Sequence, residues 1–154
     1  MVKKVRFSEQ HSTIEEIEKF YGTKEKNRQG EDLETFLEHY DPRKYETPSC
    51  TTDAVIFSIT GELLEVNQLK VLLVRRSNHP SIGFWALPGG FVEPRDTLWQ
   101  SCLRELVEET HCHLPEATMR AALQSVAVFD HPDRSQRGRT ITHAHYFEIG
   151  RAHV

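Results

Sequence analysis

The segment Gly90–Thr110 reads GFVEPRDTLWQSCLRELVEET and carries most of the chemical information in this chain of 154 residues. Its second part repeats apolar residues at the intervals that keep them on one side of a helix. We therefore expect a helix over 97–110, with a buried face formed by Leu98, Cys102, Leu103 and Leu106. Three acidic residues lie at i, i+3 and i+4 of the same helix and share another side: Glu105, Glu108 and Glu109.

Three carboxylates this close together repel one another, so their placement calls for a compensating charge. A hard cation such as Mg²⁺ or Mn²⁺ would supply it, since it prefers oxygen ligands. The alternative interpretation is an ordinary solvated acidic face in which Arg104 pairs with Glu108. The preceding Pro88-Gly89-Gly90 favours a site, because glycine lets the backbone approach a ligand closely. Asp96 is expected to cap the start of the helix.

The spacing of this segment resembles the Nudix family motif, G-x5-E-x7-R-E-U-x-E-E-x-G-U, in which U is a bulky apolar residue. The match runs from Gly90 through Asp96 to Arg104-Glu105-Leu106-Val107-Glu108-Glu109, and the preceding WALPGG is also similar to the family. Two positions depart from it. Asp96 replaces a glutamate that braces the motif arginine in the family, so the resemblance implies a supporting contact to Arg104. His111 replaces a glycine and can adopt the left-handed conformation at a cost of about 1 kcal/mol.

The resemblance implies a catalytic centre composed of Arg104, Glu105, Glu108 and Glu109. In such a centre the three glutamates and the Gly90 carbonyl hold one or more Mg²⁺ (or Mn²⁺) ions on a substrate diphosphate. Glu105 is the candidate general base or water-positioning group, and Arg104 orients the carboxylates. A cationic side chain is also expected against the diphosphate. The candidates, each of which also fits an ordinary surface charge, are Arg75, Arg76 and Arg134.

The rest of the chain predicts an α/β domain behind a short helical N-terminal extension, residues 1–47. That extension indicates one helix after Ser12, ending near Gly22, and a second over 31–40. Apolar, β-branched runs then predict strands over 54–59, 70–75, 85–87, 123–129 and 140–147. The resemblance covers 48–147 and implies a Nudix α/β/α sandwich with a mixed β-sheet. Residues 148–154 resemble the translation of a sequencing-library adapter, so we expect an incomplete, C-terminally truncated domain.

The region after the motif narrows the expected substrate. Residues 128–144 resemble the ADP-ribose pyrophosphatase-like branch of the family, which implies cleavage of ADP-ribose to AMP and ribose 5-phosphate. The alternative is an ADP-ribose-sensing Nudix-related transcriptional regulator whose DNA-binding domain lies outside this fragment. Homodimers are common in this branch, and residues 1–47 are a candidate contribution to such an interface. Four histidines fit structural or surface roles better than ligand contacts: His79, His131, His143 and His145.

Composition excludes several other classes of protein. The net charge of −4 gives no basic field for direct nucleic-acid binding, and no apolar run is long enough to cross a membrane. Three cysteines without a CxxC spacing fit reduced thiols in a cytoplasmic protein better than disulfides. A zinc site at Cys112 with its neighbouring histidines is a weaker alternative, because adjacent residues rarely form a tetrahedral site.

Overall fold

The computed structural model describes residues 26–59 and 69–150. The chain divides into two compact units, Met1–Glu46 and Thr47–Val154, each of which is considered separately. In the first unit, helix α2 (Leu33–His39) lies within the range 31–40 expected for the second helix, and a 3-10 turn, η1 (Pro42–Lys44), follows it. Asp32 caps α2 by accepting a hydrogen bond from the Thr35 backbone N–H. The helix expected after Ser12 lies outside the described residues.

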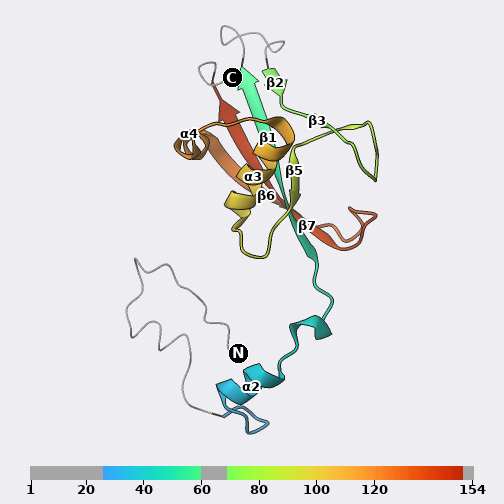
Figure 1. Cartoon of the computed structure of the whole chain (residues 1–154), viewed down its shortest axis with the longest axis vertical. Helices are drawn as coiled ribbons and strands as arrows, with labels where there is room; N and C mark the ends of the chain where they lie inside the picture. The colour runs from blue at the N-terminus through green and yellow to red at the C-terminus, as the bar shows by residue number, and fades with distance from the viewer. Residues whose placement is uncertain (1–25, 60–68, 151–154) are drawn as a thin grey trace. The chain divides into compact units, whose positions relative to one another are not determined.

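The second unit is built on a mixed sheet, as expected. Strands β2, β1, β7 and β6 lie side by side in that order, and β5 also pairs with β1 (Figure 1). Strands β3 and β4 form a separate two-stranded sheet. The pairing of β1 with β7 is parallel and the other pairings are antiparallel. The bounds are β1 (Ser49–Ile59), β2 (Leu69–Val71), β3 (Val74–Arg75), β4 (Trp85–Ala86), β5 (Gly89–Phe91), β6 (Leu123–Phe129), β7 (Thr140–Ile149), α3 (Leu98–Thr110) and α4 (Glu116–Ala122).

Three local features differ from the sequence-based expectation. The single strand expected over 70–75 is divided into β2 and β3, which belong to different sheets. Gly89 and Gly90 form part of strand β5 rather than a loop, because their backbone pairs with β1. Helix α4, which starts after Pro115, was not expected at all. A seven-residue helix offers too few turns for its apolar spacing to stand out in the sequence.

The core lies between one face of β1 and β7 and the helices α3 and α4 (Figure 1). Side chains alternate between the two faces of a strand, so every second residue of β1 and β7 enters this core. The buried apolar residues are Ala54, Ile56, Cys102, Leu106, Met119, Ala122, Phe147 and Ile149. Thr51, Asp53 and Thr142 lie on the opposite face of the same strands, together with the aromatic pair Phe57 and Tyr146.

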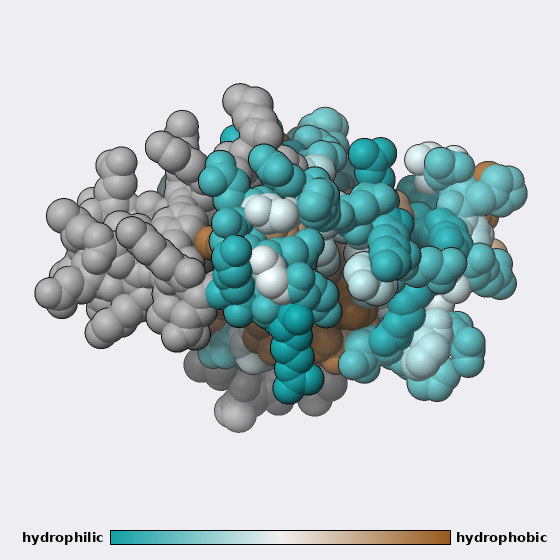
Figure 2. Space-filling model, turned by 90° about the horizontal axis from the view of Figure 1, so that it is seen from below, coloured by the Kyte–Doolittle hydropathy of each residue, from teal (hydrophilic) through white to brown (hydrophobic). Residues whose placement is uncertain are grey.

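Strand β7 continues through Glu148 and Ile149, the first residues of the segment that the adapter hypothesis sets apart. The origin of residues 148–154 stays a prediction. The coloured residues in Figure 2 are mostly hydrophilic, with smaller hydrophobic areas between them. No helix in the described parts of the chain is long and apolar enough to cross a membrane.

Candidate functional site

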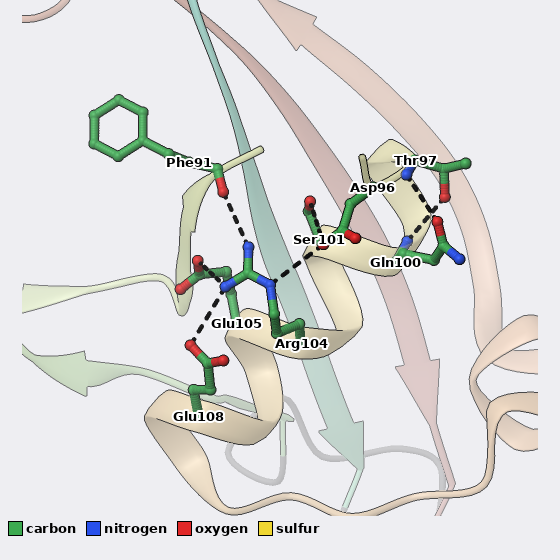
Figure 3. A network of polar contacts seen from close by, with 8 residues as sticks. All are labelled: Phe91, Asp96, Thr97, Gln100, Ser101, Arg104, Glu105 and Glu108. Carbon is green, nitrogen blue, oxygen red and sulfur yellow. Dashed lines mark hydrogen bonds and ion pairs between the residues drawn. The ribbon is translucent and has the colours of Figure 1, made fainter. Parts of the chain in front are cut away.

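Helix α3 carries most of the candidate site, and its start is determined by a reciprocal cap. The Thr97 hydroxyl accepts from the Gln100 backbone N–H at 3.2 Å, and the Gln100 side chain accepts from the Thr97 N–H at 2.8 Å. The expectation that Asp96 caps the helix is therefore wrong, because Thr97 takes that position. The Asp96 carboxylate instead accepts from Ser101 and Arg104 (Figure 3).

Arg104 organises the acidic side of α3. Its Nη1 lies 2.7 Å from a Glu105 oxygen and 3.3 Å from a Glu108 oxygen. Its Nη2 donates to the Phe91 carbonyl of β5 at 3.1 Å, and its Nε lies 3.4 Å from Asp96 (Figure 3). The hydrogen bond to Glu105 is the main reason that the pKa of Arg104 is raised. A single guanidinium thus joins three carboxylates and a neighbouring strand, which is the bracing expected from the resemblance.

The two glycines of β5 bring the backbone against the same carboxylates. The Gly89 N–H donates to Oε2 of Glu109 at 2.9 Å. A Cβ at position 90 would lie 2.5 Å from the Glu105 carboxylate, and one at position 89 would lie 2.3 Å from the Thr52 carbonyl oxygen. Real side chains do not come that close, so only glycine fits at either position without a shift. The backbone thus lies close to carboxylates of α3 at this point, whereas the expected close approach of the backbone to a ligand stays a prediction.

The residues expected to hold a metal line one open pocket: Gly90, Glu105, Glu108 and Glu109. Their oxygens are the ligands that Mg²⁺ and Mn²⁺ prefer. Within the described ranges, no three acidic, histidine or cysteine side chains are already arranged as the ligands of a metal ion. Two of the glutamates point to Arg104 and the third to Gly89. The donor set fits a divalent ion by chemistry and location, provided that these side chains rotate to share it.

The pocket has a volume of about 970 Å³, near the upper end of the ~300–1,000 Å³ typical of small-molecule sites. Its walls come from β1, the turn after β3, β5, α3 and the loop before β7. All three arginines predicted to meet a diphosphate line it. Two of them are held by carbonyl oxygens of their own loop, Arg75 by Gly83 at 3.1 Å and Arg76 by Pro80 at 2.7 Å. Arg134 instead reaches across to the sheet and donates to Thr142.

The structure adds four polar residues of the sheet that sequence reasoning missed: Thr51, Asp53, Thr140 and Thr142. Burial raises the pKa of the Asp53 carboxyl above its ordinary value of 3.8; the Arg134 guanidinium opposes that rise and the Glu109 carboxylate adds to it. Asp53 therefore lies within electrostatic reach of both the motif helix and the loop before β7. The only signal in the sequence is the short polar run Thr51-Thr52-Asp53, which directly precedes the apolar run Ala54–Phe57.

Two of the four histidines singled out in the sequence have distinct environments. His79 lines the pocket, whereas His145 is 3% exposed and lies near Trp99 and Phe147. Burial lowers the pKa of His145 below its ordinary value of 6.5. His111 ends α3 in the left-handed conformation, with φ of 56°, as expected at the position where the family motif has glycine.

Residues 52–153, more than half of the chain, match the model of the NUDIX domain. The chain belongs to the Nudix family.

Two curated relatives of this chain differ from each other in function. One is an ADPR-responsive transcriptional repressor, NtrR, of Acinetobacter baylyi, 36% identical over 71% of this chain. The other is an ADP-ribose pyrophosphatase of Methanocaldococcus jannaschii, 40% identical over 47% of this chain. The chain spans 40% of the length of each.

Two solved structures share the fold. The Nudix domain of Shewanella oneidensis NrtR, complexed with ADP ribose, is 33% identical with a TM-score of 0.64, covering 78% of this chain and 72% of that one. A bifunctional NMN adenylyltransferase/ADP ribose pyrophosphatase from Francisella tularensis, complexed with AMP and a manganese ion, is 38% identical with a TM-score of 0.59. It covers 74% of this chain and 30% of that one. The expected Nudix fold is confirmed.

Proposed function

We propose that this protein hydrolyses ADP-ribose to AMP and ribose 5-phosphate with Mg²⁺ or Mn²⁺. The observation that carries the proposal is the pocket that brings Glu105, Glu108 and Glu109 together with Gly90 and Arg134. A purely structural acidic face would not need a glycine-lined backbone against its carboxylates. The relatives support the substrate, since one is named an ADP-ribose pyrophosphatase and another was solved with ADP ribose.

The roles of the residues follow from their positions. Glu105, Glu108, Glu109 and the Gly90 carbonyl would hold the divalent ion. When bound, such an ion neutralises phosphate oxygens and makes phosphorus more open to attack. Arg104 bonds both Glu105 and Glu108 and so limits the positions that their carboxylates can take.

Glu105 is our candidate for the group that takes the proton from the attacking water. The water oxygen forms a bond to one phosphorus of the diphosphate, and the bridging P–O bond breaks. The second phosphate leaves with the bridging oxygen and the electron pair of that bond. Glu105 is suited to this task because its side chain is only 15% exposed and its carboxylate lies against the Gly90 backbone.

A regulatory function is the second candidate, and the similarity to the Acinetobacter repressor favours it. In that case the same pocket would bind ADP-ribose without cleaving it, and DNA binding would reside elsewhere in a longer protein. The three carboxylates of the motif are all present here, which favours the enzyme. The two functions differ in one measurable respect, namely whether AMP appears.

The test is AMP release from ADP-ribose with Mg²⁺, with Mn²⁺ and with EDTA, on the chain and its Glu109→Gln variant. We expect release that needs the metal and falls by at least about a hundred-fold in the variant. A matched control is Glu38→Gln, an exposed glutamate of α2 in the other unit, which should keep full activity. Tight ADP-ribose binding without AMP would support the regulator. Neither binding nor turnover would contradict the substrate.

We also propose a cytoplasmic protein and a homodimer to which residues 1–47 contribute. The three free thiols, Cys50, Cys102 and Cys112, support a reducing compartment.

Helix α2 has three apolar residues on the surface of its own unit, Leu33, Phe36 and Leu37. Light scattering of the chain with and without residues 1–46 tests the dimer. A monomer in both cases would contradict it.

A further inference from the structure

A chain of hydrogen bonds joins the loop before β7 to the floor of the pocket. Arg134 Nη1 lies 2.5 Å from the Thr142 hydroxyl, and that hydroxyl lies 2.7 Å from the hydroxyl of Thr51. Thr142 can accept from Arg134 while it donates its own proton to Thr51. Thr142 and Thr51 are neighbours in the parallel register of β7 and β1, so both hydroxyls point to the same face of the sheet.

The two threonines differ from Arg134 in burial. Thr142 is 2% exposed and Thr51 is 7% exposed, whereas Arg134 is an exposed loop residue. A long, exposed arginine side chain ordinarily samples many rotamers, and immobilising it on binding a ligand has an entropic cost. A fixed acceptor at its tip removes part of that cost before the ligand arrives.

The place where Arg134 is held lies close to the motif helix, and its guanidinium keeps free donors for an anion. Its guanidinium is close enough to Asp53 to affect that carboxyl electrostatically, and Asp53 in turn is close to Glu109 of the motif helix. The guanidinium has five N–H donors, and the bond to Thr142 uses one of them. Arg75 and Arg76, in contrast, are bound to carbonyl oxygens of the 76–83 segment. Of the three arginines predicted to meet the diphosphate, Arg134 is thus the one whose guanidinium is hydrogen-bonded to β7 of the large sheet.

We propose that Thr142 is a positioning residue: its buried hydroxyl holds the guanidinium of Arg134 at the place where the substrate diphosphate binds. This inference rests on the proposed function for its ligand, a nucleoside diphosphate derivative. Thr142 makes no bond to the substrate itself and acts through Arg134. Thr51 supports the arrangement because its hydroxyl oxygen can accept the proton that the Thr142 hydroxyl donates.

The test compares Thr142→Val, which keeps the shape and loses the hydroxyl, with Thr142→Ser, which keeps the hydroxyl. We expect Thr142→Val to raise KM for ADP-ribose about five-fold, the size expected for loss of a typical hydrogen bond, because Arg134 keeps its charge and loses only its fixed position. We expect kcat to change less than about two-fold, and Thr142→Ser to stay close to the wild type. Thr52→Val is the matched control, because its buried hydroxyl faces His145 on the other side of β1.

A double-mutant cycle separates positioning from a structural role. In an Arg134→Ala background, Thr142→Val should change KM by less than about two-fold, because the group it positions is gone. The dissociation constants of ADP-ribose and of inorganic pyrophosphate, measured by calorimetry in EDTA, provide a readout that needs no turnover. Both should weaken in Thr142→Val and recover in Thr142→Ser. The melting temperature of each variant shows whether the substitution has damaged the fold. Arg134→Ala alone tests whether this arginine binds the anion, independently of Thr142.

The outcomes distinguish this inference from the proposed function. If ADP-ribose is cleaved and Thr142→Val equals Thr142→Ser in KM and in binding, the inference is wrong and the function stands. If ADP-ribose is not cleaved but pyrophosphate binding depends on Thr142 and Arg134, the inference stands and the function is wrong. Additive effects of Thr142→Val and Arg134→Ala, or a wild-type protein that binds neither ligand, would overturn the inference.

Discussion

A Cβ at Gly90 would lie 2.5 Å from the Glu105 carboxylate. The backbone of strand β5 therefore lies so close to this side chain of helix α3 that no side chain fits at position 90. The first prediction concerns this contact. Gly90→Ala would displace the flexible end of Glu105, so we expect kcat/KM to fall at least about ten-fold with little change in the free energy of unfolding. Gly89→Ala would meet the Thr52 backbone instead, so it should lower that free energy by about 1–3 kcal/mol.

Steady-state kinetics and denaturant unfolding on the two glycine variants test this difference. If Gly90→Ala retained full activity, the close approach of Glu105 to the backbone would have no catalytic role.

The second prediction concerns Asp96, whose carboxylate lies 3.4 Å from Arg104 Nε. This is longer than the ~2.7–2.9 Å of a strong charge-assisted bond. Asp96→Glu adds one methylene and should shorten the contact, so we expect kcat/KM to rise about two- to five-fold. Asp96→Asn serves as the control and should lower it. Equal activity in all three proteins would show that the brace to Arg104 does not limit the reaction.

The third prediction concerns His111, which ends α3 with φ of 56°. Glycine adopts this conformation without strain, so His111→Gly should raise the free energy of unfolding by about 0.5–1 kcal/mol. His113→Gly is the control, because His113 has a negative φ, and glycine there only makes the unfolded chain more flexible. Urea unfolding measures both variants. A loss of stability in His111→Gly would contradict the prediction.

The fourth prediction concerns pH. The folded protein lowers the pKa of His145, mainly through burial, below its ordinary value of 6.5. As the pH falls through 6.5 toward the lowered value, the unfolded chain binds a proton at this histidine and the folded protein does not. The free energy of unfolding therefore falls with acidification, by at most about 1.4 kcal/mol per pH unit for this one group.

Comparing the slope of unfolding free energy against pH between the wild type and His145→Gln isolates this histidine from the other eight of the nine in the chain. The variant should show a shallower slope between pH 7 and 5. Identical slopes would mean that His145 takes up its proton equally well in the folded state.

Much of the local structure was predictable from the residues. The expected helix over 97–110 is observed as Leu98–Thr110, and the strands expected over 54–59, 123–129 and 140–147 all form. The side of α3 shared by its three glutamates also followed from their spacing. These features depend on residues close together in the sequence. The spacing of apolar residues shows directly whether such a segment has the period of a helix or of a strand.

The remaining features depend on pairing between distant segments. The spacing of the glutamates shows that the carboxylates of Glu105, Glu108 and Glu109 share one side of their helix. The resemblance to the family motif also places the end of that helix at position 111. Only the tertiary structure brings Thr51 and Thr142, 91 positions apart, into hydrogen-bonding distance and places Arg134 on them. The register of β1 against β7 decides that contact. Neither strand alone contains the register, because it arises from the packing of the whole sheet against α3 and α4.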